Sequence, residues 1–147
     1  MQRIAAAIGL TLAAFVAVPA QAQFAKPEDA VKYREAAMTM ISSHFGRLVA
    51  AARGSSPSDP AQVKNNAQVL QTLAALPWAA YGPGTEGGHA KPEVWSNAAD
   101  FKQKQADFTT HVAALSAAAE TGDLAKLREA VGAVGASCKA CHSSYRE

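Results

Sequence analysis

The stretch DLAKLREAVGAVGASCKACHSSY, residues 123–145, carries the pattern that decides the fold of this chain. Its apolar residues and both of its cysteines recur at alternating gaps of three and four, which places them on one helical face. They are Leu124, Leu127, Val131, Val134, Cys138, Cys141 and Tyr145. Asp123 is suited to cap the start of the helix. The sequence therefore predicts a long amphipathic helix with both cysteines on its inward face.

Three earlier segments show the same alternation of gaps, so they are expected to be helices too. The first begins at Pro27 and ends at residues 54–57, the second begins near residues 58–60 and stops at Pro77, and the third begins near residues 96–97 and ends at Gly122. The inward residues are expected to be Val31, Arg34, Met38, Ile41, Phe45 and Leu48 in the first, Val63, Ala67, Leu70, Leu73 and Leu76 in the second, and Phe101, Gln105, Phe108, Val112, Leu115 and Ala119 in the third. The pattern predicts an all-α protein, an antiparallel four-helix bundle.

Residues 138–142, Cys-Lys-Ala-Cys-His, form the C-x-x-C-H pattern of c-type haem attachment. Two thiols three residues apart on a helix can add across the two vinyl groups of one haem. His142 follows on the same face and can bind the iron. The motif therefore predicts one haem c, covalent through two thioethers to Cys138 and Cys141.

Three other chemistries use paired cysteines, and each lacks a feature that it needs. A thioredoxin-like redox pair needs a βαβ context, and none is visible. A zinc site needs four ligands, commonly two such pairs. A structural disulfide would not explain why a histidine, His142, directly follows the second cysteine. Haem attachment is the interpretation that uses all three residues.

Residues 1–22 have the pattern of a secretory signal peptide. Arg3 precedes 15 uncharged apolar residues, Ile4 to Val18, and a small-x-small cleavage site follows. A spanning helix needs about 20 apolar residues, so cleavage is favoured over a membrane anchor. We therefore expect a periplasmic domain over residues 23–147 that does not insert into the membrane after signal cleavage. Without Arg3 it carries 13 basic and 12 acidic residues and no basic block, so no nucleic-acid partner is expected.

The cysteines place the haem inside the bundle near one end, and the start of the first helix reaches that end if the helices alternate in direction. Arg34 is a charged residue on the apolar seam there. Its partner could be a haem propionate, or its guanidinium could reach solvent with the stem packed inside. Residues 77–95 are expected to be a functional loop, whose Trp78, Tyr81 and Trp95 pack against haem or partner, or only cap the core.

The chain resembles cytochrome c′ over residues 23–147. The marks of this resemblance are the motif at 138–142, Arg34-Glu35 in the first helix, Pro77-Trp78, and Gly-Pro-Gly-Thr-Glu at 82–86. The resemblance implies an up-down-up-down bundle, a homodimer packed through the first two helices, and a five-coordinate high-spin iron with His142 as the only axial protein ligand. The residues that it implies at the haem are Arg34, Glu35, Thr85, Glu86, Cys138, Cys141, His142 and Arg146, with Met38 closing the distal face.

Two of these residues have more than one interpretation. Met38 could bind the iron as sixth ligand, but Met also fills irregular gaps in cores, and packing is favoured. Arg146 could bond a proximal nitric oxide or a propionate, or it could be a cation favoured at a helix C-terminus. The other histidines, His44, His89 and His111, are expected at the surface or in loops.

The expected function is electron transfer with small redox proteins, binding of nitric oxide and carbon monoxide, or both. A six-coordinate Met38/His142 carrier that binds no gas is the alternative. A peroxidase-like enzyme needs a distal acid–base group, and Met38 and its helical neighbours supply none. We therefore expect that the protein is not an enzyme.

Overall fold

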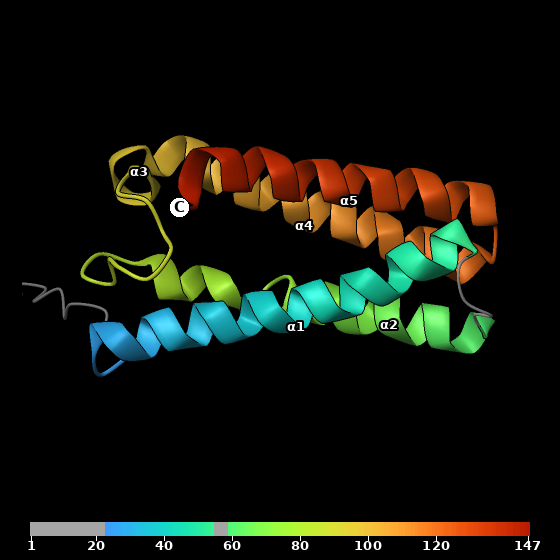
Figure 1. Cartoon of the computed structure of the whole chain (residues 1–147), viewed down its shortest axis with the longest axis horizontal. Helices are drawn as coiled ribbons and strands as arrows, with labels where there is room; N and C mark the ends of the chain where they lie inside the picture. The colour runs from blue at the N-terminus through green and yellow to red at the C-terminus, as the bar shows by residue number, and fades with distance from the viewer. Residues whose placement is uncertain (1–22, 55–58) are drawn as a thin grey trace, which may run out of the picture.

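The computed structural model describes residues 23–54 and 59–147 (Figure 1). The expected signal peptide, residues 1–22, lies outside the described residues. In chain order the elements are α1 (Pro27–Arg53), α2 (Pro60–Leu73), the 3-10 helix η1 (Pro77–Tyr81), α3 (Glu93–Ser96), α4 (Ala98–Thr121) and α5 (Leu124–Tyr145).

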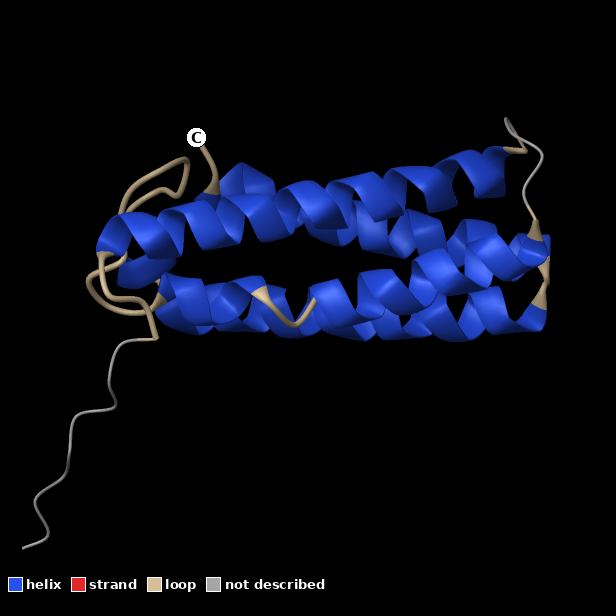
Figure 2. Ribbon diagram, turned by 90° about the horizontal axis from the view of Figure 1, so that it is seen from below, coloured by secondary structure: helices blue, strands red, loops and turns tan. Residues whose placement is uncertain are grey.

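The four long helices α1, α2, α4 and α5 run alternately up and down along one axis (Figure 1). Helix α1 packs on α2 and α5, and α4 packs on the same two helices. Among the described residues there is no strand beyond an isolated bridge between Ala90 and Arg146 (Figure 2). The predicted all-α, up-down-up-down antiparallel four-helix bundle is confirmed.

The seams predicted from the sequence form the core. Leu48, Leu70, Val112, Leu115 and Val134 are almost completely buried. Two expected core residues are instead exposed, Leu76 by 37% and Leu124 by 44%. Leu76 lies beyond Leu73, where α2 ends, so the helical phase no longer turns it inward, and Leu124 is the first residue of α5 at the end of the bundle.

The helix ends have the stop and start signals expected from the sequence. Gly54 and Gly122 close α1 and α4 with φ of +69° and +70°, a conformation that glycine adopts without strain. Asp59 accepts from the N–H of Ala61 at the start of α2, and Asp123 accepts from Ala125 N at 2.8 Å and Lys126 N at 3.2 Å. These caps fix where the chain reverses.

The substitution Asp123→Ala is expected to lower the free energy of unfolding by about 1 kcal/mol, because two N–H groups of the first turn of α5 lose their acceptor. Urea unfolding followed by circular dichroism measures the change. Glu129→Ala, on the exposed face of the same helix, is the control and should stay within about 0.5 kcal/mol of the parent. Equal effects of the two substitutions would contradict a capping role.

The segment between α2 and α4, expected as a long loop, contains the two short helices η1 and α3. It packs on α1 through η1 and on α4 and α5 through α3. The backbone N–H of Lys91 donates to Tyr145 O at 3.0 Å, and that of Glu147 donates to His89 O at 3.0 Å. The segment therefore closes the end of the bundle at which the chain terminates (Figure 1). No helix in residues 23–54 and 59–147 combines the length and hydropathy that a membrane span requires.

Candidate haem-binding site

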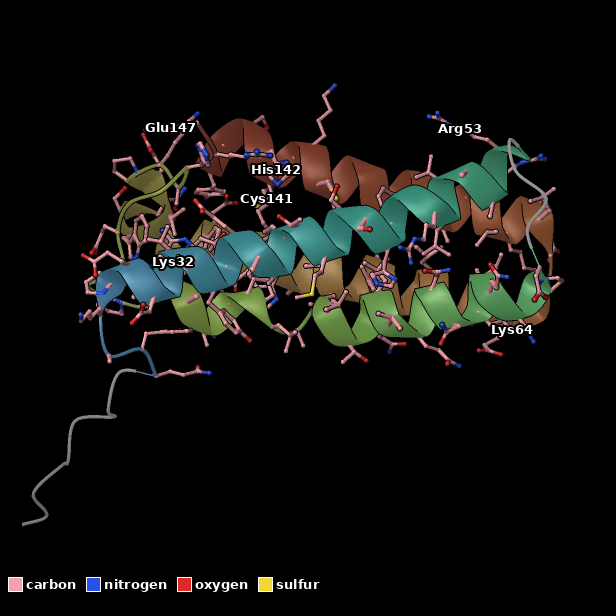
Figure 3. The ribbon with its side chains drawn as sticks, turned by 60° about the horizontal axis from the view of Figure 1, so that its bottom comes forward. Lys32, Arg53, Lys64, Cys141, His142 and Glu147 are labelled. Carbon is pink, nitrogen blue, oxygen red and sulfur yellow. The ribbon has the colours of Figure 1, made fainter. Side chains whose placement is uncertain are left out.

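A cavity of about 880 Å³ opens between α1, the η1–α3 segment, α4 and α5. Its volume lies within the range of about 300–1,000 Å³ that cofactor sites usually have. Figure 3 shows Cys141 and His142 between the ribbons of α5 and α1. Most of the expected site residues line this one cavity, namely Arg34, Glu35, Met38, Cys138, Cys141, His142 and Arg146. Helices that are far apart in the sequence thus contribute to one site.

Cys138 and Cys141 are half-buried on α5 and are not joined in a disulfide. Burial raises the pKa of Cys138. Burial likewise raises the pKa of Cys141, and the neighbouring Cys138 adds to that rise. The thiols therefore stay protonated at neutral pH, the form that adds as S–H across a vinyl group. Their spacing on one helical face fits attachment to a single macrocycle.

His142 stands one residue after Cys141 and lines the cavity. Burial lowers the pKa of its imidazole, and the positive charge of Arg146 lowers it further. A neutral imidazole keeps a nitrogen lone pair free for a metal. Within the described ranges, no group of three or more His, Cys, Asp and Glu side chains is arranged to hold a metal ion.

The other walls of the cavity are mainly apolar and aromatic. Trp78 from η1 meets Phe101 and Phe108 of α4 edge to face, with ring centroids 6.3 and 6.0 Å apart. Phe45 and the half-buried Met38 contribute from α1. A flat apolar macrocycle fits such walls. The periodicity predicted Phe45 and Phe108 as core residues, but it could not separate core positions from cavity positions.

Arg34 lies at the edge of the cavity and is only 2% exposed. Its guanidinium donates to the backbone carbonyls of Ala80 and Thr85, both at 2.7 Å, and of Gly87 at 2.6 Å. It also stacks over the ring of Tyr81, 4.7 Å from the centroid. The alternative in which the guanidinium reaches solvent is therefore wrong. Burial lowers the pKa of Arg34, and the carbonyl dipoles compensate a charge that would otherwise be unpaired.

Thr85 and Glu86 do not line the cavity. Thr85 is buried and donates through Oγ1 to Ala80 O at 3.1 Å and Gly82 O at 2.7 Å. Glu86 is exposed, and its Oε1 accepts from the N–H of Gly84 at 3.3 Å. The structure therefore places both residues in the turn that Arg34 holds against α1.

Gly88 brings the same turn into close contact with α1. Its φ is +59°, and a Cβ there would stand 2.8 Å from both Val31 Cγ1 and Glu35 Oε1. A larger residue would clash with these two side chains, so either they or the turn would have to shift. Glu35 therefore sits where the turn meets the cavity wall.

Sequence reasoning missed the polar partner of one residue in the cavity wall, Tyr145. Tyr145 is 4% exposed, and its hydroxyl donates to Asp100 Oδ2 at 2.5 Å. Burial and this bond raise the pKa of Tyr145 to about 12. Tyr145 was expected on the inward seam, but no local signal identifies a partner 45 residues earlier in the chain.

Comparison with known proteins identifies the family. The model of the family described as Cytochrome C′ matches residues 29–146. A cytochrome c′ of Alcaligenes xylosoxydans xylosoxydans is 64% identical over 85% of this chain and 98% of its own length, and one of Rubrivivax gelatinosus is 47% identical over 85% and 99%. A solved nitric oxide complex of a variant of cytochrome c prime from Alcaligenes xylosoxidans superimposes with a TM-score of 0.83 at 63% identity, covering 85% of this chain and 98% of that one. The chain belongs to the cytochrome c′ family and is a c-type haem cytochrome.

Proposed function

We propose that this chain carries one haem c in the cavity, bound through thioethers to Cys138 and Cys141, with His142 as the only axial protein ligand. The iron is five-coordinate and high-spin, and the protein binds nitric oxide and carbon monoxide and transfers electrons. The observation that carries the proposal is the convergence of Cys138, Cys141 and His142 from α5 with Met38 from α1 on one cavity.

Bound haem supplies an iron that changes between ferric and ferrous states and accepts a diatomic ligand. The residues of the chain hold the macrocycle and determine which ligands reach the iron. The two thiols fix the macrocycle on α5, and the neutral imidazole of His142 offers its lone pair to the metal. The aromatic walls from η1 and α4 exclude water from the macrocycle.

Met38 is the residue that we propose for the distal face. It is half-buried, lines the cavity, and has neither a proton nor a hydrogen-bond donor to offer. The apolar Ile41 and Phe45 line the same wall, together with the polar Glu35, Thr39 and Ser42. A Met side chain over the iron suits a small neutral gas and supplies no proton to a bound peroxide, so we propose that the protein is not an enzyme.

The three other histidines of the chain, His44, His89 and His111, could in principle supply a sixth ligand to the iron. His44 is bonded through Nδ1 to Asn66 at 2.9 Å, and His111 is bonded through Nδ1 to Ser137 at 2.5 Å. His89 lines the cavity, but its backbone is tied to the end of α5, the helix of His142. These contacts support an iron without a second histidine.

The proposal also covers the cellular location of the protein, its oligomeric state and its redox partners. The pattern of residues 1–22 supports export to the periplasm, where we propose that the protein makes brief contacts with small redox proteins. We propose a homodimer packed through α1 and α2.

Shortening Met38 tests the distal assignment. Met38→Ala is expected to raise the rate of carbon monoxide association with the ferrous protein about tenfold, which corresponds to a barrier lowered by about 1.4 kcal/mol. Flash photolysis of the carbon monoxide complex measures this rate. Met40→Ala is the matched control, because Met40 is 44% exposed on the same helix and does not line the cavity. An unchanged rate in Met38→Ala would show that another residue closes the distal face.

A further inference from the structure

Tyr145 is a buried residue of the cavity wall, and its hydroxyl is paired with the partly exposed carboxylate of Asp100, a contact that the binding of gas does not use. The phenol donates to Asp100 Oδ2 at 2.5 Å, and Tyr145 lines the cavity together with Cys141. Its ring packs edge to face on Phe101, with centroids 5.1 Å apart. The carboxylate of Asp100 reaches the surface, where its Oδ1 lies 3.9 Å from the ammonium of Lys104. The pair therefore connects the cavity with solvent.

Three other oxidisable aromatic side chains stand near the cavity, and their polar groups have different partners. Trp78 Nε1 donates to Ala74 O at 2.7 Å, and Trp95 Nε1 donates to Gly82 O at 3.1 Å. Tyr81 lies under the positive guanidinium of Arg34, 4.7 Å from its ring centroid. Among these four side chains, all in the described part of the chain, only Tyr145 donates to a carboxylate.

A carboxylate partner changes what a phenol can do. Removing an electron from a phenol makes its O–H strongly acidic, so the electron leaves readily only where a base can take the proton. A donor–acceptor distance of 2.5 Å lies in the range of about 2.5–2.7 Å of charge-assisted O–H···O⁻ bonds. The raised pKa of Tyr145 keeps the proton on the phenol at neutral pH until an electron is removed. In the described part of the chain no hydrogen bond joins the Tyr81 hydroxyl to a carboxylate, and the adjacent cation opposes loss of an electron.

We propose that Tyr145, with Asp100 as proton acceptor, is an internal electron donor to the haem when hydrogen peroxide oxidises the protein. The O–O bond of hydrogen peroxide breaks as the peroxide takes two electrons, and the two protons that complete two waters come from solvent. One electron comes from the iron and the other from Tyr145, whose O–H bond breaks. The proton passes to Asp100, and a neutral tyrosyl radical stays on residue 145. The inference rests on the haem placed in this cavity under the proposed function, and its consequence is protection of the macrocycle from oxidation.

Electron-spin-resonance spectra of the ferric holoprotein, frozen within seconds of mixing with hydrogen peroxide, test the proposal. A tyrosyl signal is expected, and it should narrow when the protein carries ring-deuterated tyrosine. Tyr145→Phe keeps the ring and its packing on Phe101 but removes the hydroxyl. This variant should lose the tyrosyl signal, and its haem absorbance band should fade faster. Tyr81→Phe is the matched control and should keep the signal. Asp100→Asn, which keeps the shape but not the base, should lower the radical yield.

Each contrary result has a distinct meaning. A signal that persists in Tyr145→Phe, or that is lost equally in Tyr81→Phe, would overturn the assignment to residue 145. An unchanged yield in Asp100→Asn would overturn the role of the carboxylate. Covalent haem is quantified in every sample by its absorbance in alkaline pyridine. A chain without it contradicts the proposed function, whereas haem present without a tyrosyl radical contradicts this inference alone.

Discussion

Replacing both cysteines, Cys138→Ser with Cys141→Ser, is expected to abolish covalent haem attachment completely. Serine keeps nearly the volume of cysteine, so α5 and the packing of position 138 against the core should remain. A hydroxyl does not add to a vinyl group as a thiol does, so neither thioether can form. The denatured protein should then have the mass of the polypeptide alone, and all haem should extract into acidified organic solvent.

The single substitutions and a neighbouring control sharpen this result. Cys138→Ser and Cys141→Ser should each retain one thioether, so haem stays with the chain but the pyridine absorbance band shifts toward that of a free vinyl group. Ser137→Ala, at the adjacent residue on the same cavity wall, should retain full attachment. Haem that remains covalently bound in the double variant would show that another side chain holds it.

Arg34→Met is expected to be among the most destabilising single changes in the chain, by about 3–5 kcal/mol. Methionine keeps an unbranched stem of similar length, so the change removes the donors with little loss of packing. The carbonyls of Ala80, Thr85 and Gly87 are then left without the guanidinium, each at a cost of about 1–3 kcal/mol where water cannot replace it. Urea unfolding of wild type and variant measures the difference.

Arg47→Met is the matched control for this prediction. Arg47 is exposed on the same helix and donates one long bond, 3.4 Å to Asn66 Oδ1. Its replacement should change the free energy of unfolding by less than about 0.5 kcal/mol. In addition, limited proteolysis should cleave residues 82–88 faster in Arg34→Met, because the anchor of this turn is lost. Similar stabilities of the two variants would show that the turn holds to α1 without Arg34.

The four long helices could be predicted from the sequence because their signals are local. The alternating gaps placed Leu48, Leu70 and Leu115 in the core, and Asp123 and Gly122 marked where one helix ends and the next begins. The same method was wrong at the helix ends. Periodicity says nothing about where a helix stops, so it wrongly predicts Leu76 on the inward face although α2 ends three residues earlier.

The segment from residue 74 to residue 97 could not be predicted in the same way. Its conformation depends on side chains from distant helices. Arg34 on α1 binds carbonyls 46 to 53 residues later, and Tyr145 bonds to Asp100 across 45 residues. No spacing rule covers such pairs. The haem motif was visible because its three functional residues follow one another on a single helix.

The most direct test of this account is the visible and electron-spin-resonance spectrum of the purified wild-type protein, ferric and ferrous, with and without carbon monoxide and nitric oxide. The account predicts covalent haem with a high-spin ferric iron, and a ferrous iron that binds both gases, because His142 is the only axial protein ligand and Met38 only closes the other face. A low-spin iron that ignores both gases would contradict it. That result would mean that Met38 or a histidine occupies the sixth position and that the protein is solely an electron carrier.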